Sequence, residues 1–172
     1  MKKLSLILAM ILLFTACGGP VDINTEEGAA KVEEKVEEAL FAYHRDIHDD
    51  LDCDGVGFVI MGQEEVDGQV KVYTICSYGA YEERDGAMCK IQGHACIPMV
   101  VTLNAENLKP VKVEEPEDSE RYYESAEELF PADYHERIFN LSIDDFTAVS
   151  GMETDMISKY LEKKGLEMVI KY

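Results

Sequence analysis

The sequence lacks the signatures of several common enzyme classes. No Gly-x-Ser-x-Gly elbow occurs, and Gly55-x-Gly57 is not followed by the helix start that would hold a phosphate. The zinc-protease motif His-Glu-x-x-His is missing, since His135-Glu136 continues as Arg-Ile-Phe. So is Ser-x-x-Lys, the motif of a serine acylated by beta-lactams. We therefore expect a non-enzymatic protein with no catalytic residue and no cofactor.

Basic residues and long apolar runs are also scarce. The chain has 16 Lys and Arg against 35 Asp and Glu, and its formal net charge is −19 at pH 7. Such a surface repels phosphate backbones, so nucleic acid is not an expected partner. After the N-terminus, no segment approaches the ~20 apolar residues that a membrane-spanning helix needs. There is no internal repeat, and one acidic domain is expected.

The first residues are typical of a lipoprotein signal. A basic start, Met1-Lys2-Lys3, precedes an apolar run from Leu4 to Phe14, which at about 1.5 Å per helical residue covers roughly half of a bilayer core. Thr15-Ala16-Cys17 then resembles a bacterial lipobox, with Phe14 in place of the usual Leu. An ordinary secretory signal is the alternative, but it would leave Cys17 as an odd thiol.

This signal predicts how the chain is processed and located. We expect removal of residues 1–16, acylation of Cys17 with diacylglycerol and palmitate, and a flexible tether over residues 17–24. Residues 25–172 then form a single domain. The protein would be lipid-anchored on the extracytoplasmic face of the bacterial cell membrane.

Four further cysteines lie in or beside apolar runs, where a thiol behaves as a small buried hydrophobe. Two disulfides could form in three connectivities outside the cytoplasm, and spacing alone does not choose among them. Mostly free, buried thiols are the favoured interpretation. The four residues are Cys53, Cys76, Cys89 and Cys96.

Periodicity predicts one long helix followed by strands. An Asn24 cap with Glu27 begins a helix that ends near Asp50. Its apolar stripe consists of Ala29, Val32, Val36, Leu40, Tyr43 and Ile47. Strands are then predicted over residues 58–61, 70–81, 87–91, 97–103 and 108–113.

Turn residues and proline shape the predicted sheet. Asp67-Gly68 and Asp85-Gly86 supply tight hairpin turns, and Pro98 indicates a bulge or bend between residues 93 and 98. Alternation puts Tyr73 and Tyr81 on one face of their strand and Tyr78 on the other.

Short helices follow the strands. Prolines punctuate two of them, near residues 125–130 and 132–140. Two capping boxes, Ser142-x-x-Asp145 and Ser150-x-x-Glu153, each predict a helix start. The last helix stops at Gly165, and residues 166–172 add a final strand.

The order of these segments resembles a known module. The resemblance covers roughly residues 43–139 and is to the extracellular C-terminal module of beta-lactam-sensor-like membrane metallopeptidases of Gram-positive bacteria. It implies an envelope protein, but the module has no assigned chemistry. Glu114, Ser119 and Arg121 depart from residues common in such modules. The segments that carry the resemblance are 57–62 (GFVIMG), 70–73 (VKVY), 78–81 (YGAY), Gly93 with Ile97-Pro98, 115–118 (EPED), Tyr122, and 128–131 (ELFP) with Tyr134 and Arg137.

Metal sites are incomplete in the sequence. His44 and His48, one helical turn apart, are weak zinc candidates on the flank of the stripe because distant third and fourth ligands are not evident. Cys89-x4-His94-x-Cys96 is similar, since strand geometry separates its cysteines. The acidic segment 114–118 lacks the spacing of a calcium loop. No metal is therefore expected.

We therefore expect an α+β domain, with a long N-terminal helix packed on an antiparallel sheet of about four to five strands and short C-terminal helices. A cystatin-like sheet is the leading arrangement. The expected function is that of an extracytoplasmic binding or interaction protein, with a partner of unknown identity, protein or small molecule. A cell-envelope hydrolase or metal-dependent enzyme is the alternative, and it would need a pocket gathering His44, His48, Cys53 or the segment 114–118. The residues of the expected binding loop are Glu115, Glu117, Asp118 and Tyr122.

Overall fold

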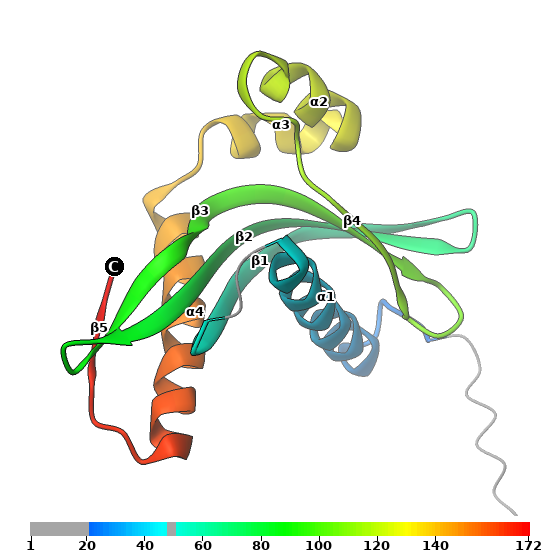
Figure 1. Ribbon diagram of the computed structural model, residues 1–172. Helices are drawn as coiled ribbons and strands as arrows, with labels where there is room; N and C mark the ends of the chain where they lie inside the picture. Colours follow the sequence, from blue (N-terminus) through cyan, green and yellow to red (C-terminus); the bar gives the residue numbers. More distant parts are fainter. Residues whose placement is uncertain (1–20, 48–50) are drawn as a thin grey trace, which may run out of the picture.

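A curved, mostly antiparallel sheet forms the centre of the domain. The computed structural model describes residues 21–47 and 51–172. The sheet order is β1-β2-β3-β4, and β5 pairs with the other end of β3 (Figure 1). β5 is parallel to β3, which corrects the expectation of a purely antiparallel sheet. The strands are β1 (Cys53–Val66), β2 (Gln69–Arg84), β3 (Ala87–Asn104), β4 (Pro110–Glu114) and β5 (Val169–Lys171).

Two tight turns fix the meander, as the sequence predicts. Asp67 and Gly68 have φ values of 52° and 74°, and Asp85 and Gly86 have 51° and 72°. Positive φ at both central residues matches the right-handed twist of the flanking strands. Each turn therefore joins its two strands directly, and register follows from the turn.

β3 is a single long strand where two were predicted. The register with β2 shifts between Ala80 and Tyr81 and again between Cys76 and Tyr78. The second shift lies where Pro98 predicts a bulge, and Cys96 there has a φ of 57°. A bulge lets a strand bend without ending, so β3 continues through the gap between the two predicted strands.

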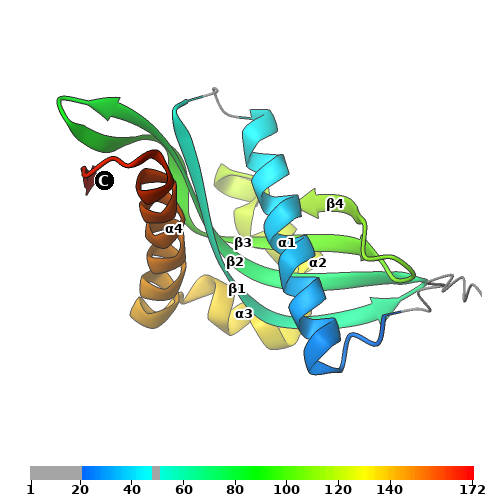
Figure 2. The ribbon, with the colours of Figure 1, turned by 90° about the horizontal axis from the view of Figure 1, so that it is seen from below.

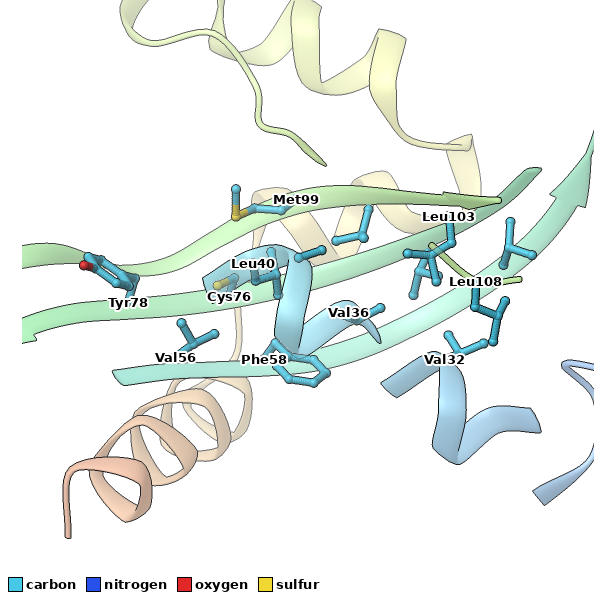
Figure 3. Packing of buried hydrophobic residues seen from close by; sticks show 14 of the residues in the cluster. Val32, Val36, Leu40, Val56, Phe58, Cys76, Tyr78, Met99, Leu103 and Leu108 are labelled. Carbon is cyan, nitrogen blue, oxygen red and sulfur yellow. The ribbon is translucent and has the colours of Figure 1, made fainter. Parts of the chain in front are cut away.

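Helix α1 (Glu26–Ile47) crosses one face of the sheet (Figure 2). Val32, Val36 and Leu40 are fully buried and pack against strand residues such as Phe58 (Figure 3). Ala29, predicted in the same stripe, is exposed. The stripe thus forms the core through its middle residues. The side chain of Ile47 lies outside the described residues.

The start of α1 differs from the predicted cap. Thr25 Oγ1, not Asn24, accepts a hydrogen bond from the Gly28 amide at 3.0 Å. Ile23 is buried, and its carbonyl accepts a hydrogen bond from Gln63 at 3.0 Å. The end of the predicted flexible tether is therefore packed on the domain. Residues 17–20 of the tether lie outside the described residues.

Four helical elements follow the sheet. Figure 1 shows α2 and α3 on the opposite side of the sheet from α1. Tyr73 packs with α2 and α3, Tyr81 with α4, and Tyr78 with the α1 side, which confirms the predicted alternation. The elements are the 3-10 helix η1 (Ser119–Arg121), α2 (Tyr122–Leu129), α3 (Ala132–Phe139) and α4 (Ile143–Lys164).

α4 is one continuous helix, and this corrects the second predicted start. The capping box of Ser142 and Asp145 is present, and Gly165 ends the helix with a φ of 68°. Ser150 lies inside the helix, so Ser150-x-x-Glu153 is not a capping box. Packing of the apolar side of α4 on the sheet stabilises the helix through residue 150, and a local capping motif does not outweigh that packing.

Glycines let α4 lie very close to β1. A Cβ at Gly57 would be 1.8 Å from the Val149 carbonyl oxygen, and one at Gly55 would be 3.0 Å from the Glu153 carbonyl oxygen. Gly55-x-Gly57 is therefore the platform on which the helix docks. The predicted fold class is confirmed, although α4 matches α1 in length instead of being short. Among the described helices, none is long and apolar enough to cross a membrane.

Candidate functional site

A buried carboxylate lies where α4 meets the sheet. Glu153 is only 1 % exposed, although it is charged. Its oxygens accept hydrogen bonds from the hydroxyls of Ser77 and Tyr81, the latter at 2.5 Å, and from Lys90 Nζ at 2.8 Å. A buried charge is tolerated when it is paired and hydrogen-bonded in this way. We call Ser77, Tyr81, Lys90 and Glu153 the Glu153 cluster.

Strand alternation and two glycines build this cluster. Ser77 and Tyr81 are four residues apart on β2, so their side chains point to the same face as Gly79 between them. A Cβ at Gly79 would lie 2.2 Å from Glu153 Oε1, and one at Gly93 would lie 2.7 Å from Lys90 Cε. The paired glycines therefore leave room for both the carboxylate and the lysine stem.

The environment keeps the tyrosine in its donor form. Burial raises the pKa of Tyr81 well above its usual value, and the hydrogen bond to Glu153 raises it further. At neutral pH the phenol is thus protonated and donates to the carboxylate. The ammonium of Lys90 offsets the charge of Glu153, and its side chain is 19 % exposed, so the ammonium remains partly accessible.

A cavity of about 600 Å³ opens beside the cluster, between the first half of α4 and β3. This volume lies within the range of small-molecule sites. Ser77, Lys90 and Glu153 form its polar floor. The remaining lining residues are Ala95, Phe146, Thr147, Ser150, Gly151, Thr154 and Tyr172.

Gly151 is unusual for a residue inside a helix. A Cβ there would meet nothing within 4 Å, so no packing requires glycine at this position. Glycine in a helix interior costs about 1 kcal/mol relative to alanine. The missing side chain instead widens the cavity that Gly151 lines.

The expected binding loop lies at a different place. Glu115, Asp118 and Tyr122 line a smaller cavity of about 210 Å³ together with His94 and Cys96. The structure therefore brings three of the four predicted residues together. Glu117, the fourth predicted residue, does not line this cavity and instead pairs with Arg121 at 3.0 Å.

One loop carboxylate is tied to α1. Tyr43 donates a hydrogen bond to Glu115 at 3.2 Å. Burial, followed by the charge of Glu115, raises the pKa of Tyr43 to about 12. Glu115 thus helps hold the loop against α1.

His44 is buried, which corrects its expected position on the flank of α1. Its ring stacks on Tyr78 with centroids 4.5 Å apart, and Nε2 lies 3.6 Å from Cys76 Sγ. His48 lies outside the described residues. Within residues 21–47 and 51–172, no group of three or more His, Cys, Asp or Glu side chains is arranged to hold a metal ion.

The four cysteines of the domain are free thiols. Cys53 and Cys76 are buried as predicted, whereas Cys89 and Cys96 are partly exposed.

Sequence reasoning missed the Glu153 cluster. Its signal was an acid within an apolar stripe, since Val149, Glu153, Ile157 and Leu161 follow at four-residue steps and all are buried. The capping-box pattern Ser150-x-x-Glu153 offered a competing interpretation.

Comparisons with family models, with curated proteins and with solved structures find no match to this chain.

Proposed function

We propose that the protein is a lipid-anchored extracytoplasmic binding protein of the bacterial cell envelope, and that its ligand site is the cavity between α4 and β3. The observation that carries this proposal is a roomy cavity whose floor is a buried, fully hydrogen-bonded charge cluster. Fixed polar groups at the base of an otherwise apolar hollow are typical of small-molecule sites.

The chemistry of the cluster favours binding over catalysis. Ser77 is buried, and its hydroxyl donates to the Glu153 carboxylate. That carboxylate is itself held by Tyr81 and Lys90. These groups stabilise one another, which suits a rigid recognition surface. The lipobox and the resemblance to a sensor-like module support a place in the envelope and a link to envelope sensing.

A cavity-blocking variant tests the proposal. The mature chain is produced with Cys17→Ser behind a substitute secretory signal, and NMR follows binding of a panel of acyl, aromatic, sugar and peptide compounds. A panel member should perturb residues that line the cavity. Gly151→Phe should abolish that binding, because its ring fills the open space at Gly151.

Glu162→Phe is the matched control, because it adds the same ring to an exposed position of α4 that does not line the cavity. It should bind as the parent does. Absence of binding by the whole panel, or equal binding by Gly151→Phe, would contradict the proposed function.

A further inference from the structure

We propose that the cavity binds an uncharged, single-chain acyl ester of a polyol, with its hydroxylated head inside and its chain at the rim. This inference rests on the proposed binding function and names the ligand class. It follows from three features of the cavity: the charge of its floor, the hydrogen-bonding character of its helical wall, and the apolar residues at its mouth.

The floor disfavours a charged head. Lys90 and Glu153 form an ion pair at 2.8 Å, so the floor has no net charge. A cation would find Glu153 already accepting from three donors. An anion would gain little from an ammonium whose charge is offset, within a chain of formal charge −19. A neutral carbonyl oxygen can still accept one of the three N–H groups of Lys90.

The helical wall offers a hydrogen-bond acceptor. Thr147 donates its hydroxyl proton to the Ile143 carbonyl at 2.8 Å, and Thr154 donates to the Ser150 carbonyl at 2.7 Å. With its proton used inside the helix, Thr147 Oγ1 presents lone pairs to the cavity, whereas Thr154 Oγ1 already accepts from the Tyr172 hydroxyl. A hydroxyl group of a ligand can donate to Thr147. The wall and Lys90 together therefore match a head that carries both hydroxyl and carbonyl groups.

The mouth of the cavity is apolar. Phe146 is 50 % exposed and Tyr172 is 71 % exposed, and both line the cavity. Ile143, one turn before Phe146, is 84 % exposed at the start of the same helix. Several large exposed side chains close together suit contact with the first part of an acyl chain. An ester that enters from the membrane surface with its head first would place the hydroxylated head in the cavity and the acyl chain at its mouth.

The experiment compares three probes that share one chain and differ in the charge of the head. They are monolauroyl glycerol, laurate and dodecylamine, each titrated at neutral pH below its micelle concentration into the Cys17→Ser chain. We expect monolauroyl glycerol to bind about tenfold more tightly than either charged probe. Thr147→Val, which keeps the shape but removes the acceptor, should weaken monolauroyl glycerol roughly fivefold. Thr147→Ser should restore the affinity.

Each outcome has a distinct meaning. Laurate or dodecylamine binding as tightly as the ester would overturn the uncharged head. Failure of all three probes, in a chain that binds another compound of the panel in a Gly151-dependent way, would overturn the ligand class and leave the binding function standing. Failure of the probes and of the whole panel would contradict both. Unchanged ester binding by Gly151→Phe would place the ester outside the cavity and also overturn the inference.

Discussion

Lys90 of β3 holds its ammonium 2.8 Å from the carboxylate of Glu153 on α4, and this ion pair joins the helix to the sheet beside the cavity of about 600 Å³. Glu153 is only 1 % exposed, so bulk water solvates its charge very little. The lysine therefore stabilises a charge that burial would otherwise disfavour strongly.

Removing the lysine should destabilise the fold. We expect Lys90→Met to lower the free energy of unfolding by about 3 kcal/mol, since it leaves the Glu153 charge buried without its cation. The double variant Lys90→Met with Glu153→Gln should recover at least about 1 kcal/mol of that loss, because no buried charge remains. Urea unfolding measures both. A loss below about 1 kcal/mol in the single variant would refute the role given to the pair.

Two glycines should respond to alanine with opposite signs. Gly57→Ala places a methyl group 1.8 Å from the Val149 carbonyl oxygen, so we expect a loss of about 3 kcal/mol or more as α4 is pushed from the sheet. Gly151→Ala meets nothing within 4 Å and should stabilise the helix by about 1 kcal/mol. Thermal unfolding of the pair checks the prediction. Equal effects would show that close docking of α4 on β1 is not what requires Gly57.

The thiols should react with a maleimide in two classes. Burial, followed by the nearby charge of Asp54, raises the pKa of Cys53 from 9.0 to about 12, which lowers its thiolate fraction at neutral pH roughly a thousandfold. Burial also raises the pKa of Cys76. Partly exposed Cys89 should be modified in the folded protein, whereas Cys53 and Cys76 should need unfolding. Peptide mass analysis after timed labelling identifies the modified sites, and early modification of Cys76 would contradict its burial.

Acid should remove one contribution to the stability of α4. The hydrogen bond from Arg137, at 2.5 Å, lowers the pKa of Asp145 below its ordinary value of 3.8, and Ser142 adds to this. A pKa that is lower in the folded chain stabilises the fold above 3.8 and stops doing so as pH falls through the folded value. Asp145→Asn should cost about 1 kcal/mol at neutral pH. The difference from the parent should shrink on acidification, and a difference independent of pH would argue against this carboxylate as the source.

Membrane attachment should depend on Cys17. We expect the native protein to partition with membranes into detergent, and Cys17→Ser behind a substitute secretory signal to be released as a folded domain. Folding should survive, because the described core begins at Ile23, beyond the substituted residue. Fractionation and N-terminal mass analysis test this. An unmodified residue other than Cys17 at the mature N-terminus would exclude the lipoprotein signal.

Local signals in the sequence determined most of the elements. The two Asp-Gly turns, the Ser142 capping box and the Gly165 stop each depend on a few neighbouring residues, and the structure confirms all of them. The middle of the α1 stripe and the alternation of β2 are likewise periodic properties of a single segment. The fold class follows from the order of such segments.

Tertiary structure decided the features that join distant segments. Glu153 bonds to Ser77, Tyr81 and Lys90, which are 76, 72 and 63 residues away in the chain. The pattern Ser150-x-x-Glu153 could start a helix, or it could place a buried acid on the side of a helix that faces the sheet. The close docking of α4 on β1 decides between these, and the glycines that allow this docking lie in β1. The burial of His44 and the parallel pairing of β5 likewise depend on partners outside their own segments. A short stretch of sequence determines the secondary-structure preference of its own segment. Burial and hydrogen bonding between segments exist only after the chain has packed. The cavity at the Glu153 cluster is a product of that packing.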